Sequence, residues 1–267
     1  MIRAELRRQL LRRRTWLGIG AMVVLPVLVA VILVFTGPPH RGTGTPMLVD
    51  LATGSGLNYA LFAVSVISQL LLLIVVALFA GDPVASEASW GSLRYLLLRP
   101  VPRGQLLRVK LTVGLLLSGV AALALVLAAG LSGWLAFGGG GLTTPLGASL
   151  GTGESLRIFL LTSAYVTSQQ LVVAALAFLL STVTDAPLGA VGGAVLLMIV
   201  SSVLDAITSL GAFRYGLPNH YAFSWFGLLS SPQQTAQMVR GLVLQVPWTV
   251  VPLALAWRHF ARKDILS

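Results

Sequence analysis

The chain has 267 residues, of which 56% are hydrophobic and only 10% are charged. Soluble domains carry roughly 25% charged residues, so this composition excludes an ordinary soluble protein and favours a membrane protein. The chain has no cysteine, which excludes disulfides, a thiol nucleophile and a cysteine-ligated metal.

The formal net charge is +10, and the cations are grouped along the chain. Fourteen of the eighteen Lys and Arg residues fall in three places: six within residues 1–15, five within 81–110 and three after Ala256. A nucleic-acid-binding domain would instead present a basic face on a soluble fold, so we expect no nucleic-acid partner. Because short loops rich in Lys and Arg stay in the cytoplasm, all three places are predicted to be cytoplasmic.

Residues 1–15 contain six arginines, with Ile2, Leu6 and Leu10 spaced to form one apolar face of a basic helix. Two interpretations stay open. The helix is either a simple cytoplasmic anchor, or it lies along the inner membrane surface and binds anionic lipid or a partner. The next apolar run, 16–35, has about the twenty residues that a span needs. Since no small-residue cleavage site follows it, we predict a retained first span.

Five further apolar runs of suitable length predict five more spans, at residues 59–80, 111–137, 158–180, 187–210 and 239–257. The segments between them that hold few charges are placed outside, at residues 37–58, 138–157 and 211–238. The last of these is rich in aromatic residues, which suits the membrane interface, and short helices dipping into the membrane stay open as an alternative. The sequence therefore predicts one all-α transmembrane domain with six spans and both termini in the cytoplasm.

Residues 81–110 form the only long basic stretch between two spans. From Glu87 to Leu98, apolar residues recur at helical spacing, and Pro100 and Pro102 end this predicted helix. A second basic helix is predicted from Arg103 into the third span. A short amphipathic helix followed by a proline corner suits a surface that docks on another protein.

This stretch resembles the signature region of ABC-2-type transporter permeases. That family has a Glu-x-x-x-Gly-[Ser/Thr]-Leu segment, a leucine-rich turn, a Pro-x-[Ser/Pro]-Arg corner and a lysine that opens the third span. The matching residues are Glu87, Gly91, Ser92, Leu93, Leu97, Leu98, Pro100, Pro102, Arg103 and Lys110. The chain departs from the pattern in having proline where serine is common, and in its Gly- and Pro-rich first outer loop.

The resemblance implies that the loop is a coupling helix seated in a groove of a cytoplasmic ATPase, with the turn at 181–186 as a second contact. Glu87 would open this helix, where its charge suits the positive end. The residues assigned to ATPase coupling are Glu87, Gly91, Leu93, Leu97, Arg99, Pro100, Arg103 and Asp185. The resemblance also implies an exporter in the plasma (inner) membrane with two ATPase copies, and a second permease subunit that forms a homodimer or a heterodimer.

The chain itself does not contain the motor. A P-loop requires Gly-x-x-x-x-Gly-Lys-[Ser/Thr], and the only lysines, Lys110 and Lys263, are not followed by Ser or Thr. We therefore expect ATP and Mg on a partner subunit and no cofactor in this chain. The three histidines lie outside the predicted spans and no His-Glu-x-x-His pattern occurs, so a membrane-embedded enzyme is disfavoured. A non-transporting assembly or sensory partner of an ATPase stays open as the alternative.

Four glutamines fall within the predicted spans, namely Gln69, Gln169, Gln170 and Gln245. An amide buried without a partner costs about 1–3 kcal/mol, so these side chains should face the bundle or a cavity. They either form interhelical hydrogen bonds or line a substrate path. Because no predicted span is expected to carry a buried Lys, Arg or Glu, such a path suits an amphipathic or apolar solute better than an ion. Asp205, the only acid well inside a span, is either functional or an interfacial residue.

Overall fold

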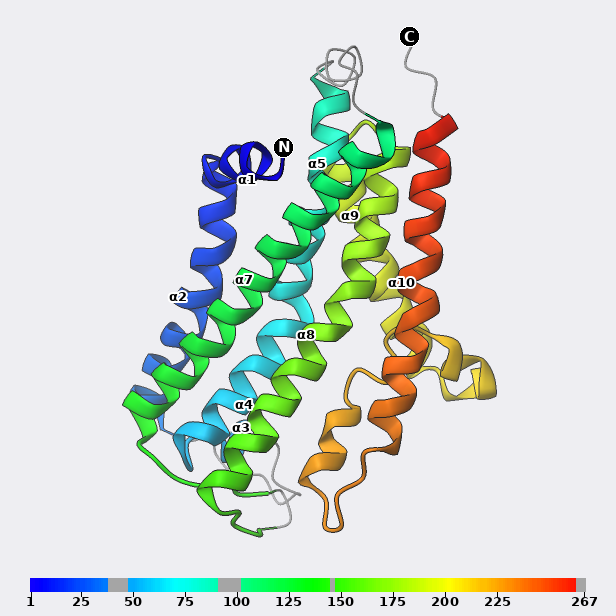
Figure 1. Cartoon of the computed structure of the whole chain (residues 1–267). Coiled ribbons are helices and arrows are strands. Elements are labelled where there is room, and N and C mark those ends of the chain that lie inside the picture. Colours follow the sequence, from blue (N-terminus) through cyan, green and yellow to red (C-terminus); the bar gives the residue numbers. More distant parts are fainter. Residues whose placement is uncertain (38–47, 91–101, 145–146, 263–267) are drawn as a thin grey trace.

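The computed structural model describes residues 1–37, 48–90, 102–144 and 147–262 (Figure 1). In this part of the chain the regular secondary structure is helical, and an isolated bridge joins Thr143 to Ser149. Six helical segments are long and apolar enough to cross a membrane, which confirms the predicted all-α polytopic fold.

These six segments form one bundle, and each contains most or all of a predicted span (Figure 1). The prediction is wrong at one end, because the fifth helix stops at Ala206 and not at 210. The six segments are α2 (Arg13–Thr36), α4 to α5 (Gly56–Ser89), α7 (Arg103–Phe137), α8 (Thr152–Val183), α9 (Pro187–Ala206) and α10 (Ala236–Arg262).

Shorter helical elements complete the described chain. The second segment consists of α4 (Gly56–Ile67), a π-helical turn η1 (Ser68–Leu72) and α5 (Leu73–Ser89). The others are α1 (Ile2–Leu10), α3 (Leu48–Leu51) and the 3-10 helices η2 (Thr208–Gly216) and η3 (Ser224–Leu229).

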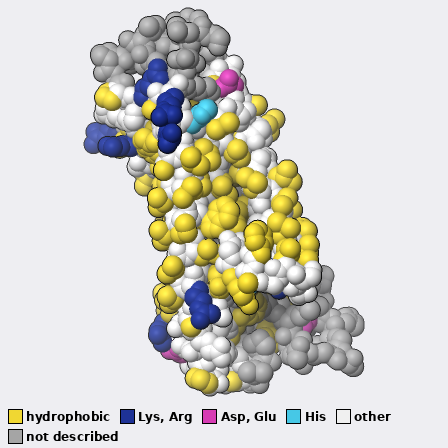
Figure 2. Space-filling view, turned by 90° about the vertical axis from the view of Figure 1, so that its right-hand side faces the viewer, with side chains coloured by type: hydrophobic (Ala, Val, Ile, Leu, Met, Phe, Trp, Pro, Cys, Tyr) yellow, Lys and Arg dark blue, Asp and Glu magenta, His cyan; other side chains and the backbone are white. Residues whose placement is uncertain are grey.

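The outer surface of the bundle is apolar over its middle. Figure 2 shows hydrophobic side chains covering the middle of the face in view, with Lys and Arg near the two ends. Leu127 and Leu135 of α7 and Val31 of α2 are among the large apolar residues that point outward. A soluble protein rarely exposes so large an apolar area, whereas lipid tails cover it at no cost. The surface therefore agrees with a multi-pass membrane protein.

The segment from α4 to α5 is the most buried of the six and packs against α7, α8 and α9. Glycine allows the closest approach. A Cβ at Gly114 of α7 would lie 2.8 Å from the carbonyl oxygen of Phe79 in α5, and one at Gly133 would lie 2.4 Å from the carbonyl oxygen of Gly56. Small residues let two backbones meet in this way inside a membrane. Helix α7 is thus held directly against α4 and α5.

Helix α1 lies across one end of the bundle, the end at which α5 ends, α7 begins and α10 ends (Figure 1). We call this the α1 end. The first and last helices of the chain thus reach the same end of the bundle, as an even number of spans requires. That this end faces the cytoplasm stays a prediction from the cation-rich segments.

The predicted helix from Glu87 to Leu98 is wrong at its start. Glu87 lies in the last turns of α5, which continues from the second span to Ser89. The helix tolerates Pro83 because neighbouring helices supply polar partners. Ser181 Oγ of α8 accepts hydrogen bonds from the backbone N–H groups of Val84 and Ala85, at 3.2 and 3.0 Å. The remainder of the predicted coupling helix lies outside the described residues. The predicted start of the next helix at Arg103 is confirmed.

The segment 211–238 folds back onto α8 and α10 through η3. The hydroxyl of Tyr165 donates to the carbonyl of Tyr221 at 2.7 Å, and Nε1 of Trp248 donates to that of Gly216 at 3.0 Å. These helices therefore satisfy part of the irregular backbone, as broken helices at membrane depth require. The predicted interfacial aromatic residues divide into an exposed set, Phe213, Tyr215, Phe223 and Phe226, and a buried set, Tyr221 and Trp225.

Candidate functional site

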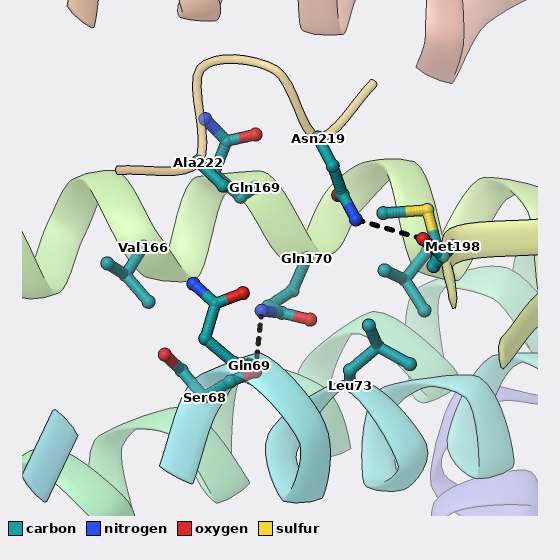
Figure 3. A pocket seen from close by; sticks show the side chains of 10 residues that line it. Ser68, Gln69, Leu73, Val166, Gln169, Gln170, Met198, Asn219 and Ala222 are labelled. Carbon is teal, nitrogen blue, oxygen red and sulfur yellow. Dashed lines mark hydrogen bonds between the residues drawn. The ribbon is translucent and has the colours of Figure 1, made fainter. Parts of the chain in front are cut away.

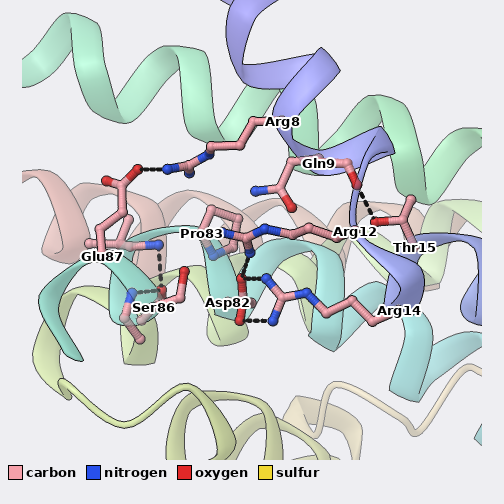
Figure 4. A network of polar contacts seen from close by, with 12 residues as sticks. Arg8, Gln9, Arg12, Arg14, Thr15, Asp82, Pro83, Ser86 and Glu87 are labelled. Carbon is pink, nitrogen blue, oxygen red and sulfur yellow. Dashed lines mark hydrogen bonds and ion pairs between the residues drawn. The ribbon is translucent and has the colours of Figure 1, made fainter. Parts of the chain in front are cut away.

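A cluster of ionised side chains lies at the α1 end, where α1 and the start of α2 meet α5 and α7 (Figure 4). This charge cluster consists of Glu5, Arg8, Arg12, Arg14, Asp82, Glu87 and Lys110. Three of its members are almost fully covered: Asp82, Glu87 and Lys110 are 2%, 1% and 2% exposed. Burying an ion in such a place without a partner costs on the order of several kcal/mol, so proteins neutralise or pair buried ions. The fold therefore requires these buried charges to be paired.

Glu87 joins three helices. Its Oε2 lies 2.6 Å from Nζ of Lys110 in α7, and its other carboxylate oxygen accepts a hydrogen bond from Arg8 in α1. Lys110 also donates to the carbonyl of Pro83 at 2.8 Å. Glu5 binds Arg8 at 2.7 Å and lies 3.9 Å from Lys110. The lysine that opens the third span thus pairs with the glutamate that ends the second.

Asp82 binds the start of α2. Arg14 donates through both terminal nitrogens to both carboxylate oxygens, and Arg12 Nη1 lies 2.7 Å from Oδ2. The guanidinium of Arg12 also lies over the ring of Trp90, 5.2 Å from its centroid. A bidentate arginine–carboxylate contact fixes the orientation of the two groups as well as their distance. Asp82 therefore sets where the first span begins relative to the second.

The acids keep Arg8 charged. Burial by itself would lower the pKa of its guanidinium, but Glu87 and Glu5 outweigh burial and raise the pKa above its ordinary value. Arg8 is thus a permanent cation for Glu87 at any physiological pH.

The cluster refines the two interpretations of the N-terminal arginines. Arg8, Arg12 and Arg14 bind acids within the chain, while Arg3, Arg7 and Arg13 are exposed and free to meet lipid headgroups or a partner. Leu6 and Leu10 pack against the core, as the predicted apolar face requires, whereas Ile2 is exposed.

The structure describes three of the predicted coupling residues. Glu87 is covered by Arg8 and Lys110, so it does not face a second protein in this conformation. Arg103 Nη1 donates to the carbonyl of Ala261 at 3.2 Å, which ties the start of α7 to the end of α10. Asp185 is exposed in the turn between α8 and α9. The other five lie outside the described residues: Gly91, Leu93, Leu97, Arg99 and Pro100.

Sequence reasoning missed Asp82 and the role of Lys110, and the expectation that no spanning helix buries a Lys or Glu is wrong. The predicted span boundaries stopped at Ala80 and Leu111, but the helices continue to Ser89 and back to Arg103. One signal could have found the cluster. The stretch from 81 to 90 holds two acids at the end of a span, on the same predicted side of the membrane as six arginines. Opposite charges so placed can pair.

Three of the four predicted glutamines meet at one cavity between η1 and α8 (Figure 3). Gln69, Gln169 and Gln170 line it, and Gln245 is buried elsewhere on α10. Nε2 of Gln170 donates to the carbonyl of Ser68 at 3.3 Å, within the π-helical turn. The cavity measures about 20 Å³, and a single water needs roughly 10–15 Å³. In this conformation it has room for water and not for a solute.

Asp205 binds two side chains from the segment that follows it. Its Oδ1 lies 2.5 Å from Nδ1 of His220 and 3.5 Å from Nε of Arg214. It is therefore a paired residue at the end of α9, as the interfacial interpretation expects. Over the described ranges of the chain, no group of three or more His, Asp and Glu side chains could hold a metal ion.

The helical bundle, its apolar outer surface and its paired buried charges define an all-α, multi-pass membrane protein. A family model described as "Protein of unknown function (DUF2705)" matches residues 23–266. The chain therefore belongs to the DUF2705 family. No curated protein matches it. Asp82, Glu87 and Lys110 lie inside the matched range, whereas α1 and its arginines precede it.

Proposed function

We propose that this chain is the transmembrane permease subunit of an ATP-driven ABC exporter, which couples a separate ATPase to efflux across the plasma membrane. One observation carries the proposal. The first and last charged residues of the ABC-2-like pattern, Glu87 and Lys110, form a buried ion pair of 2.6 Å at the α1 end. The end of α5 and the start of α7 are therefore held together at the α1 end, which supports a docking loop between them.

The charge distribution supports the same arrangement. Arg3, Arg7 and Arg13 are exposed at the α1 end, and the loop itself adds Arg94 and Arg99. In the proposal this end faces the cytoplasm and binds an ATPase. The whole transporter has two ATPase copies, which bind ATP and Mg, and a second permease subunit completes its membrane part. Leu93, Leu97 and Arg99 supply the contact with the ATPase. In the proposal Glu87 acts indirectly, because its pair with Lys110 joins the end of α5 to the start of α7.

The turn between α8 and α9 supplies the second contact. Asp185 and Leu188 are both exposed there, and Ser181, just before the turn, binds the backbone of α5. The glutamine cavity lies between the segment from α4 to α5, at η1, and α8. In the proposal it is the closed form of a path for an amphipathic or apolar solute.

The test begins with a search for a P-loop ATPase encoded beside this chain and continues with co-purification of the two proteins. Leu93→Asp should abolish co-purification because a charge enters the apolar face that fills the ATPase groove. Leu11→Asp is the matched control, since Leu11 is 76% exposed at the same end of the bundle. Membrane insertion is measured for both variants by the yield of folded protein in gel filtration. If both variants retain the ATPase as the unaltered chain does, the coupling assignment is wrong.

A second measurement separates an exporter from a non-transporting partner of an ATPase. The reconstituted pair is tested for ATPase activity stimulated by added amphipathic compounds. Stimulation that Leu93→Asp removes supports transport coupling. A stable complex whose ATPase activity responds to no compound supports the non-transporting alternative.

A further inference from the structure

A larger cavity, of about 430 Å³, lies where η2 and η3 meet the start of α10. It is on the half of the molecule away from the α1 end (Figure 1). Binding sites for small molecules have volumes of roughly 300–1,000 Å³, so this one can hold a headgroup or a small anion. The residues that line it are Tyr215, His220, Tyr221, Ser224, Gln237 and Arg240.

The wall of this cavity is rich in hydrogen-bond donors. Arg240 contributes a guanidinium, Gln237 an amide, and Tyr215 and Ser224 a hydroxyl each. Within the described residues, no acid forms an ion pair with Arg240. The lining contains no carboxylate. A cation without a counter-ion, set among neutral donors, favours an anionic ligand.

The acid near this cavity, Asp205, already pairs with two other side chains. Asp205 lies 2.5 Å from Nδ1 of His220 and 3.5 Å from Nε of Arg214. The imidazole is held further by two aromatic rings, because Tyr215 and Tyr221 meet it edge-on with centroids 5.0 and 4.7 Å away. Nδ1 is therefore committed to Asp205, and the position of the ring is fixed at the wall of the cavity. Asp205 positions the histidine and does not compete with the ligand.

The surroundings favour an anion that carries an apolar tail. The rings of Phe213 in η2, of Phe226 in η3 and of Phe223 just before η3 are exposed. Aromatic rings prefer the membrane–water interface, where lipid headgroups lie. We propose that the cavity binds a phosphate group, as borne by a lipid headgroup or by a free anion. Arg240 is its principal charge partner, and Gln237, Tyr215 and Ser224 donate to the remaining phosphate oxygens. This site is independent of the proposed exporter function, since no ATPase takes part in it.

The test is a ligand-dependent thermal shift of the purified full chain in a neutral detergent. Three probes are compared: 1-myristoyl lysophosphatidic acid, lysophosphatidylcholine of the same chain length, and inorganic phosphate. Any ligand that binds only the folded state raises the unfolding temperature with concentration. We expect the lysophosphatidic acid to raise it at lower concentrations than the choline lipid does. Arg240→Gln should weaken that binding about tenfold, the scale of one charge-assisted hydrogen bond.

Arg157→Gln is the matched control. Arg157 is an exposed arginine at the start of α8, on the same half of the molecule, and it pairs with Glu154 at 3.3 Å. It should leave probe binding unchanged. Tyr215→Phe is a second variant, which removes only the hydroxyl of an exposed side chain and should weaken binding about two- to tenfold.

The outcomes separate the two sources of phosphate. Binding of lysophosphatidic acid alone, weakened in Arg240→Gln, supports a lipid headgroup site. Binding of inorganic phosphate with the same dependence on Arg240 supports a site for a free anion. Equal stabilisation by the choline lipid, or equal effects of Arg240→Gln and Arg157→Gln, overturns the proposal. Retention of full affinity by both Arg240→Gln and Tyr215→Phe overturns it as well.

Discussion

Replacement of Glu87 by glutamine tests the charge cluster most directly. The amide keeps the size of the side chain but removes its charge, and it leaves Lys110 buried opposite a neutral group. Among the described residues, Lys110 then keeps the carbonyl of Pro83, at 2.8 Å, and the carboxylate of Glu5, at 3.9 Å. Removing one partner of a buried ion pair costs about 3–5 kcal/mol. Because Glu5 still offsets part of the charge, we expect a loss at the lower end, about 3 kcal/mol.

A double-mutant cycle isolates the pair. Lys110→Met by itself removes the buried cation opposite Glu87 and keeps Arg8, whose side chain is 35% exposed and therefore compensates less. The double variant contains no uncompensated buried charge. We expect it to be more stable than the sum of the two single losses by about 2 kcal/mol, within the range for residues in contact. The free energy of unfolding is measured in mixed micelles with increasing dodecyl sulfate, followed by tryptophan fluorescence.

Glu154→Gln is the control for charge removal alone. Glu154 pairs with Arg157 near the surface, where such pairs contribute about 0–1 kcal/mol. Additive effects of Glu87→Gln and Lys110→Met, or losses no larger than that of Glu154→Gln, would refute a buried ion pair between α5 and α7.

Four further predictions concern the cluster, the packing, the topology and the cavity. Asp82→Asn removes the carboxylate that binds Arg12 and Arg14, and hydrogen exchange of residues 2–10 should become faster, with Asp185→Asn as an exposed control. Gly114→Ala places a Cβ 2.8 Å from the Phe79 carbonyl and should lower the unfolding temperature, whereas Gly119→Ala, with nothing within 4 Å, should not. Because the chain has no cysteine, single cysteines at 44, 147 and 219 should react with an impermeant thiol reagent from outside, and those at 100 and 185 only after permeabilisation. Gln69→Leu and Gln169→Leu should change the range of compounds that stimulate the ATPase if the cavity belongs to a path, and should lower stability alone if it does not.

The apolar runs predicted the helices well because hydropathy reports what a bilayer requires of each segment by itself. The start of α7 at Arg103 was equally predictable, because Pro102 restricts the backbone before it and cannot donate within a helix. Hydropathy fails where a charge ends the apolar run but the helix continues. Asp82 and Glu87 extend α5 into the charge cluster because arginines from α1 and α2 neutralise them.

The arrangement of the sites needed tertiary structure. Glu87 and Arg8 are 79 positions apart in the chain, so no local pattern connects them. The four glutamines were predicted to face inward from their depth in the spans, but depth does not set how a helix is rotated about its axis. Three of them converge on one cavity, and Gln245 does not because its helix presents it elsewhere. The pairing of Asp205 with His220 depends in the same way on how η2 and the following turn fold back.

The charge cluster also constrains how the proposed exporter could move. Glu87, Lys110 and Arg8 join α5, α7 and α1, and Gly114 places the backbone of α7 against that of α5. Separating these helices would break buried ion pairs at about 3–5 kcal/mol each, so moving them together costs less. A pull on residues 91–101 therefore displaces α1, α5 and α7 as one block. Among the described residues the contact between α5 and α8 contains no ion pair, and Ser181 contributes two hydrogen bonds to neutral backbone groups there, so we propose that movement occurs at this contact. The glutamine cavity lies along this same contact, so sliding there is the motion that would enlarge it.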